Sequence, residues 1–120
     1  MRFESDSKEL VTGTEPIALF DAQIASAVLA NDRYPEAITQ ARLAISEYPP
    51  GAGQNAGFPW LVLIAAESAN GRDAEARANL QEYLATPRTW RTMADIQKIP
   101  YVAANTKLLE GLRRAGMPAE

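Results

Sequence analysis

The sequence contains an internal repeat, in which a short polar segment lies between two segments of helical periodicity. Segments 32–37 and 71–76 align without a gap, and the residue numbers of Ala37 and Ala76 differ by 39. Each polar segment lies between segments whose apolar residues recur every three or four positions, which is the period of an α-helix. Repeats of this length are typical of stacked helical hairpins. The pattern therefore predicts two similar helix–turn–helix units.

The remaining apolar pattern also predicts helices, and no stretch alternates long enough to predict a strand. Proline stands where a helix is expected to begin or to stop, as Pro35 and Pro87 do. Gly71 and Gly116 are expected to take the left-handed conformation that ends a helix. We expect helices over about 16–30, 35–48, 59–69 and 73–86, a short fifth helix that Thr89 caps and Pro100 ends or kinks, and a sixth over 102–115.

The first helix is expected from apolar residues that recur with helical spacing, and the segment before it is expected to have little structure. Residues 1–15 are mostly polar and form an N-terminal arm in this interpretation. The residues that recur with helical spacing after Pro16 are Ile17, Phe20, Ile24 and Val28.

Both hairpins resemble the tetratricopeptide repeat (TPR), a helix pair of roughly 34 residues with the pattern W-x₂-L-G-x₂-Y, then A-x₃-F, then P. Ala37 and Ala76 match its small residue, which lets two helices approach closely. Glu67 stands where the second hairpin would have the Tyr. The positions that carry the match are Trp60, Leu63, Ala76, Leu80 and Pro87 in the second hairpin, and Ile24, Val28, Ala37 and Pro49 in the first.

The resemblance implies an all-α fold of two degenerate TPR-like hairpins in a right-handed superhelical stack. The hairpins would span 16–49 and 57–87 of a domain over 16–115. Helices within 89–115 would cap the stack, and 116–120 would form a tail. A helical bundle without superhelical stacking is the alternative.

From residue 57 onward the chain is also similar to the C-terminal region of bacterial multidomain regulators. The match runs through GRDAEARANLQEYLATPRTW and IPYV to the ending LLEGLRRAGMP at 108–118. In those proteins a TPR region follows a class III adenylate/guanylate cyclase domain or a winged-helix DNA-binding domain. The resemblance implies a non-catalytic interaction or regulatory module, the TPR tail of a cyclase signalling protein. The alternative is the effector region of a winged-helix transcriptional regulator.

Composition excludes several classes of function. The 120 residues include no Cys and no His, which excludes disulfide scaffolds, Cys/His zinc sites and imidazole-based triads. The net charge of −3 predicts no general affinity for nucleic acid or anionic membranes. The apolar run 60–66 is far shorter than the roughly 20 residues that span a bilayer. Residues 1–9 lack the apolar core of a signal peptide, so a cytoplasmic location is expected.

No motif predicts a catalytic, metal-binding or cofactor-binding residue, and the chain is expected not to be an enzyme. The sequence GAGQNAG at 51–57 is a near miss for the dinucleotide fingerprint and lacks the preceding strand, so an inter-repeat loop is expected. Charged pairs near expected helix ends are interpreted as partners of the helix dipole rather than as sites. These are Asp32 and Glu36, Asp73 and Glu75, and Arg113 and Arg114. Arg88 and Arg91 beside Trp90 are likewise interpreted as a solvated helix start.

The family pattern predicts one binding groove, because the first helix of each TPR hairpin lines the concave face. Its lining would be Leu19, Ala22, Ser26, Leu29, Phe58, Leu61, Ala65 and Ser68. This face is apolar and small, and it suits an apolar peptide, a helix or a neighbouring domain of a parent chain. The helix over 102–115 is expected to close the C-terminal end of the stack. The outer side of the first hairpin, with Phe20 and Ile24, is expected to dock an upstream domain or a second copy, as in a homodimer.

Overall fold

A computed structural model of the chain describes residues 4–48, 54–85 and 90–120, and only the backbone of 4–16, 54, 55 and 101. These residues form helices and no strand, so the all-α class is confirmed within the described part. Residues 51–53 of the predicted loop lie outside it. The helices are α1 (Glu4–Ala30), α2 (Tyr34–Glu47), α3 (Phe58–Ala69), α4 (Asp73–Ala85), α5 (Met93–Ile96), α6 (Pro100–Ala103) and α7 (Thr106–Ala115), with a 3₁₀ helix, η1 (Gln54–Gly57), before α3.

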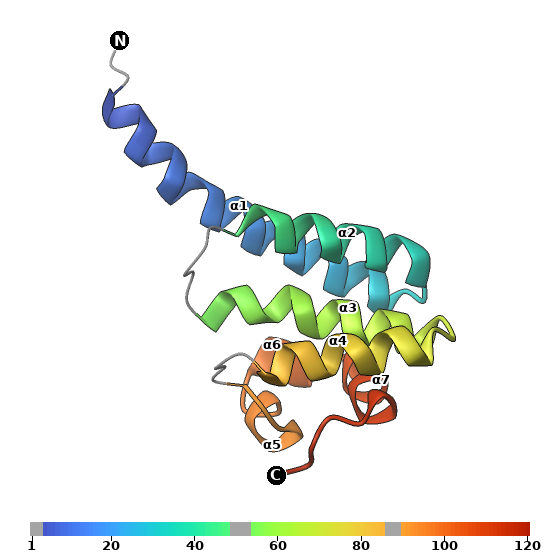
Figure 1. Ribbon diagram of the computed structural model, residues 1–120. Helices are drawn as coiled ribbons and strands as arrows, with labels where there is room; N and C mark the ends of the chain where they lie inside the picture. The colour runs from blue at the N-terminus through green and yellow to red at the C-terminus, as the bar shows by residue number, and fades with distance from the viewer. Residues whose placement is uncertain (1–3, 49–53, 86–89) are drawn as a thin grey trace.

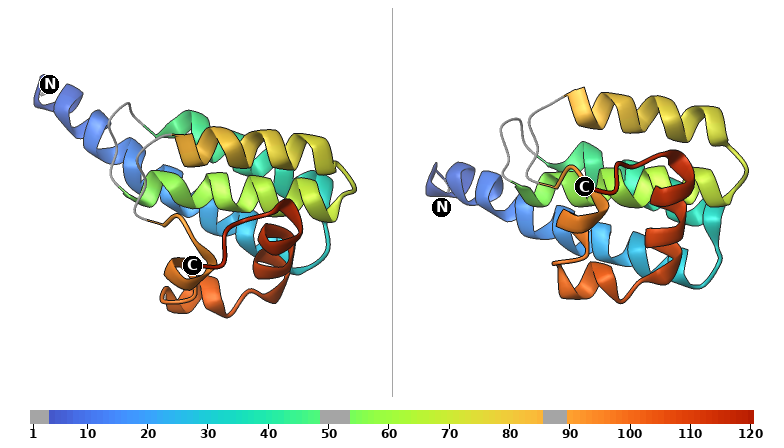
Figure 2. Two further views of the ribbon diagram at one scale, coloured as in Figure 1. Left: turned by 60° about the horizontal axis from the view of Figure 1, so that its bottom comes forward. Right: turned by 90° about the horizontal axis from the view of Figure 1, so that it is seen from below.

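Helix α3 is the centre of the fold. Helices α1 and α2 form one hairpin and α3 and α4 a second, with α2 and α1 packed on α3 (Figure 1). The C-terminal helices lie on another side of α3, where α7 makes the most extensive contacts (Figure 2). The N-terminal part of α1 extends beyond the packed helices (Figure 1).

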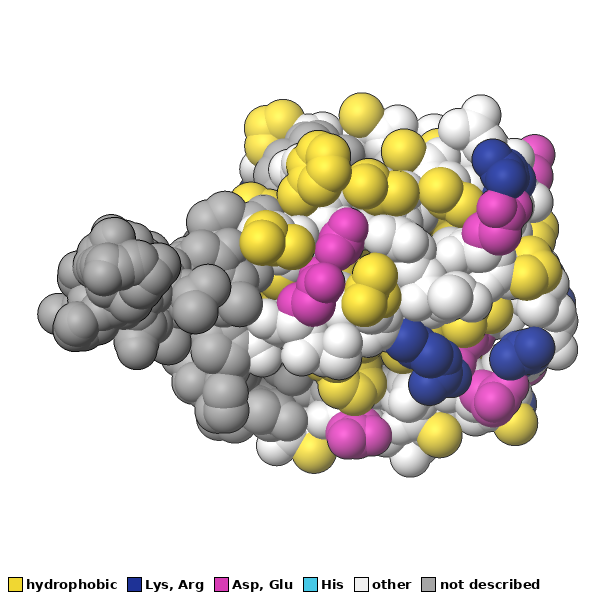
Figure 3. Space-filling model, turned by 90° about the horizontal axis from the view of Figure 1, so that it is seen from above, with side chains coloured by type: hydrophobic (Ala, Val, Ile, Leu, Met, Phe, Trp, Pro, Cys, Tyr) yellow, Lys and Arg dark blue, Asp and Glu magenta, His cyan; other side chains and the backbone are white. Residues whose placement is uncertain are grey.

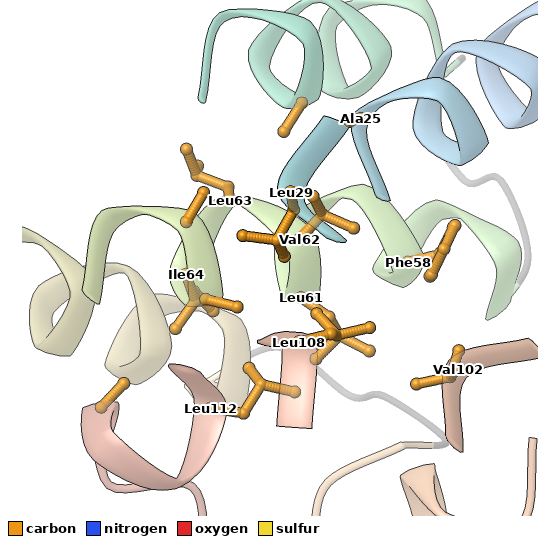
Figure 4. Packing of buried hydrophobic residues seen from close by; sticks show 14 of the residues in the cluster. Ala25, Leu29, Phe58, Leu61, Val62, Leu63, Ile64, Val102, Leu108 and Leu112 are labelled. Atoms are coloured by element: carbon orange, nitrogen blue, oxygen red, sulfur yellow. The ribbon is translucent and has the colours of Figure 1, made fainter. Parts of the chain in front are cut away.

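The run of consecutive apolar residues in α3 explains its central place. Residues 61–68 are all buried, because helices cover α3 on several sides. Side chains such as Leu61 and Leu63 leave α3 on different sides and enter one continuous core (Figure 4). Trp60, which the repeat pattern aligns with the TPR Trp, is only partly buried.

The turn between α1 and α2 closes with two characteristic backbone hydrogen bonds. The N–H of Arg33 donates to the carbonyl of Val28 at 3.2 Å, and the N–H of Asp32 donates to that of Leu29 at 3.0 Å. Asp32 has a φ of 65°. This combination is the Schellman ending of a helix, which is usually completed by glycine.

The turn between α3 and α4 repeats this geometry 39 positions later. The N–H of Arg72 donates to the carbonyl of Glu67 at 2.8 Å, and the N–H of Gly71 to that of Ser68 at 3.2 Å. Gly71 has a φ of 80°, so it takes the left-handed conformation that the sequence predicts. Gly71 corresponds to Asp32, which means that the sequence repeat is also a repeat of backbone conformation.

We predict that the turn at Asp32 tolerates glycine but not a branched side chain. A left-handed backbone costs most residues roughly 1–2 kcal/mol, whereas glycine and short polar residues adopt it more readily. Asp32→Val should therefore lower the free energy of unfolding by about 1–2 kcal/mol, and Asp32→Gly by less than about 1 kcal/mol. Urea unfolding measures both. Ala30→Val is the control at an exposed helical position, and an equal loss there would contradict the prediction.

Helix α1 is longer than the sequence predicts. It begins at Glu4 and continues through Pro16, so the expectation of an unstructured arm is wrong from Glu4 onward. Proline removes one backbone hydrogen bond, and a long helix can continue through that loss. Ile17 and Phe20, two of the apolar residues that recur with helical spacing, are exposed. The buried residues of α1 are instead Ala18, Ala22, Ala25 and Leu29.

The C-terminal segment is divided more finely than the sequence predicts. The expected helix over 102–115 is two helices, and Asn105 between them caps α7 by accepting a hydrogen bond from the N–H of Leu108. Pro100 begins α6 rather than ending the fifth helix. Helix α7 ends at Gly116, which has the predicted positive φ.

Helix α5 is capped by Thr92 and Asp95, whose side chains each accept a hydrogen bond from the other residue's N–H. The cap predicted at Thr89 lies outside the described residues. The inward side of this segment is confirmed, because Trp90, Met93 and Ile96 are buried.

Candidate interaction surfaces

The concave face predicted as a binding groove is part of the core. Helix α7 packs against α3 and also contacts α1, and it covers the face on which these residues lie. The prediction of an open groove is therefore wrong: the chain's own C-terminal helices occupy the face. Of the predicted lining, Ala22, Leu29, Phe58, Leu61, Ala65 and Ser68 are buried, and Leu19 and Ser26 are partly buried.

A close backbone contact explains why α7 fits this face. A Cβ atom added to Gly111 would lie 2.6 Å from the carbonyl oxygen of Ala65 and 2.8 Å from its Cβ. Glycine on α7 and alanine on α3 let the two helices approach more closely than larger side chains would allow. Instead of closing the end of the stack, as the sequence suggested, α7 lies across the faces of α3 and α1.

Polar contacts fix the start of α7 to the first hairpin. The Asn105 amide donates to the carbonyl of Ser26 at 3.0 Å and to its Oγ at 2.9 Å. Lys107 Nζ lies 2.9 Å from Asp32 Oδ1, which also accepts a hydrogen bond from the Tyr34 hydroxyl. These hydrogen bonds, first that from Lys107, lower the pKa of Asp32. The turn of the first hairpin is thus joined to α7 by an exposed charge pair.

A buried carboxylate joins three helices at the centre of the molecule. Glu67 of α3 has no exposed surface. Its Oε1 accepts a hydrogen bond of 2.7 Å from the amide of Asn79 on α4. Its Oε2 lies 3.2 Å from Nη2 of Arg42 on α2. Burial raises the pKa of Glu67, while Asn79 and Arg42 act in the opposite direction. The carboxylate is satisfied by protein groups and acts as a structural link.

The charged pairs that the sequence assigned to helix ends lie at helix ends. Asp73 and Glu75 stand in the first turn of α4, and Arg113 and Arg114 in the last turn of α7. Arg114 Nε is 3.4 Å from Asp73 Oδ1. Across the described side chains, no group of three or more acidic residues is placed to hold a metal ion.

The outer face of the first hairpin carries an apolar patch that the structure leaves open. Three large hydrophobic side chains are exposed in the described part of the chain: Ile17 (55%), Phe20 (63%) and Leu43 (46%). All three belong to α1 or α2. Hydrophobic side chains gather around a pair of acidic ones on this side of the molecule (Figure 3).

Two acidic side chains of this hairpin, Asp21 of α1 and Glu47 of α2, lie beside each other. Asp21 Oδ1 accepts a hydrogen bond of 3.1 Å from the Gln40 amide of α2. Hydrogen bonding with Asp21 is the first cause that raises the pKa of the Glu47 carboxyl, followed by desolvation. We use the name outer face for Ile17, Phe20, Asp21, Leu43 and Glu47. Sequence reasoning selected Phe20 for this surface but missed the acidic pair, because its two members come from different helices.

No protein-family model, curated protein or solved structure matches this chain. No helix in the described ranges is long and apolar enough to cross a membrane. The functional argument therefore depends on the chain's own surfaces.

Proposed function

We propose that this chain is a non-catalytic protein-interaction module that binds its partner through the outer face. One observation carries the proposal: the exposed large hydrophobic side chains Ile17, Phe20 and Leu43 all lie on the first hairpin. Exposed apolar side chains that gather on one side of a protein are typical of interaction sites. The alternative surface, the concave face, is occupied by α7.

We further propose that the two hairpins are degenerate TPR-like units in a right-handed stack. Support comes from the turns, whose backbone hydrogen bonds and positive φ angles recur 39 residues apart at Asp32 and Gly71. The small residues Ala37 and Ala76 are both fully buried, as close packing of the paired helices requires.

The resemblance of residues 108–118 to bacterial multidomain regulators also supports a proposal about the kind of protein to which this module belongs. In this view the module is the cytoplasmic regulatory tail of a class III adenylate/guanylate cyclase protein. The effector region of a winged-helix transcriptional regulator is the second candidate. In either setting the outer face would dock a neighbouring domain or another protein.

Photo-cross-linking tests the interaction surface directly. A benzoylphenylalanine placed at Phe20 in cells that express the protein should cross-link a defined partner, because this side chain is mostly exposed and belongs to the outer face. The added change Leu43→Glu should reduce the cross-link at least about fivefold, since a charge there disrupts apolar docking. Mass spectrometry identifies the attached segment.

The matched control places the same photoreactive group at Gln81, an exposed position on α4. Equal products from positions 20 and 81 would contradict the proposed surface, and formation of cyclic nucleotide by the purified chain would contradict a non-catalytic role. A cross-linked segment from a cyclase domain, or from a winged-helix domain, decides between the two settings.

A further inference from the structure

The outer face has acidic side chains without a basic partner. Within the described part of the chain, neither Asp21 nor Glu47 forms an ion pair with Lys or Arg, and the donor to Asp21 is the neutral amide of Gln40. Other acidic side chains of the same structure do have cationic partners: Asp32, Glu36, Glu67, Asp73 and Glu75. The pair on the outer face combines this lack of a cationic partner with direct contact between its two carboxyl groups.

One oxygen of this pair also lacks a hydrogen-bond donor. Glu47 Oε1 is shielded from solvent and has no hydrogen-bond partner among the described residues. The neighbouring Asp21 carboxylate cannot donate unless one of the two groups is protonated, which is why their proximity raises the pKa of Glu47. A Lys or Arg docked beside the pair would offset the repulsion between its two carboxylates.

We propose that the outer face binds an amphipathic helix that presents apolar residues to Ile17, Phe20 and Leu43 and a Lys or Arg to the Asp21–Glu47 pair. This inference rests on the proposed function and adds the chemistry of the partner. Two neighbouring helices form a groove into which a third helix can pack. A guanidinium or ammonium group supplies the donors that both carboxylates accept.

Charge argues against a second copy of the chain as the occupant. A two-fold interface buries the same surface on both copies, and the outer face carries two carboxyl groups but no Lys or Arg that could meet them. Like charges across an interface disfavour the wrong partner, whereas opposite charges select the right one. The chain's net charge of −3 adds to the repulsion between copies.

Binding of designed peptides to the full chain tests the inference. Two fluorescein-labelled amphipathic helices of about five turns share one apolar face, and carry either Arg or Glu along its edge. Fluorescence anisotropy at low salt should show the basic peptide binding at least about tenfold more tightly than the acidic peptide. The preference should shrink at high salt, because salt screens exposed charges.

Variants separate the two parts of the surface. Asp21→Asn with Glu47→Gln should reduce the preference for the basic peptide to less than about twofold while apolar binding remains. Phe20→Ser should weaken binding of both peptides at least about tenfold. Glu110→Gln with Glu120→Gln removes the same charge from exposed positions on α7 and the tail, and should leave the preference unchanged. Circular dichroism confirms that each variant is folded.

Three results would overturn the inference. Equal affinity for the two peptides would contradict the preference for a basic partner. It would still agree with an apolar interaction surface, so the proposed function would survive. If neither peptide binds but the cross-link at Phe20 still forms, the inference about the partner's chemistry is overturned and the proposed function again survives. Sedimentation that shows a dimer, lost on Phe20→Ser, would assign the face to a second copy.

Discussion

Replacing Gly111 with alanine is expected to lower the free energy of unfolding by about 2 kcal/mol. The new Cβ would lie 2.6–2.8 Å from the oxygen, Cα and Cβ of Ala65. Two of these atoms belong to the backbone of α3, so no side-chain rotation relieves the overlap and α7 must move. Alanine favours a helix by about 1 kcal/mol over glycine, which offsets only part of the cost. Urea unfolding gives the difference in free energy.

The position next to it supplies the control. Glu110 is exposed on the same helix, so Glu110→Ala should change the free energy of unfolding by less than about 0.5 kcal/mol. Gly111→Val should exceed the alanine effect and increase binding of a hydrophobic dye, because a displaced α7 uncovers Leu61 and Ala65. A Gly111→Ala protein as stable as the wild type would contradict the close packing of α7 on α3.

The orientation of α1 shows where sequence patterns reach their limit. Two sets of residues on this helix have the correct spacing, a bulky set that includes Ile17 and Phe20 and a small set that includes Ala22 and Ala25. Hydrophobicity favours the bulky set as the inward face. The structure buries the small set, because the facing side of α2 is also built from alanines: Ala37, Ala41 and Ala44. Close approach of the two helices decides the outcome, and it depends on both partners.

Features set by local sequence were easier to predict than contacts between distant segments. The turn at Gly71 and the helix end at Gly116 follow from glycine's conformational freedom and a few neighbouring residues. The contact between Gly111 and Ala65 joins segments far apart in the chain, and nothing in either segment identifies the other. The predicted groove failed for this reason, since its apolar residues required a cover that lay elsewhere in the sequence.

In the sequence Glu67 stands out only because it occupies the Tyr position of the repeat pattern, and its hydrogen-bond and ion-pair partners are evident only from the fold. Truncation by Glu67→Ala is expected to lower the free energy of unfolding by about 2–4 kcal/mol. It would leave a cavity between α2, α3 and α4 and remove the acceptor of the Asn79 amide. Glu67→Gln keeps the size and an acceptor for Asn79, so it should cost less. Chemical denaturation at neutral pH compares the two variants.

The pH dependence of stability distinguishes the buried charge of Glu67 from its shape. Burial raises the folded-state pKa of Glu67 above the ordinary value of 4.5, so between these two values the native state binds more protons than the unfolded state. Stability contributed by this group therefore rises as the pH falls from neutrality toward about 4.5. Asp32 and Asp95 have pKa values lowered from the ordinary 3.8, so their opposite effect on stability begins as the pH falls below about 5.

Glu47 also has a raised pKa and contributes a slope of the same sign. The wild type should consequently gain stability relative to Glu67→Gln as the pH is lowered from 7 to about 5, while Glu47, present in both proteins, cancels in the comparison. Glu110→Gln, at an exposed position, should follow the wild-type profile. If the free energies of unfolding of the wild type and Glu67→Gln change in parallel with pH, the carboxyl of Glu67 has the same pKa in the folded and unfolded chains. That result would contradict its burial between the three helices.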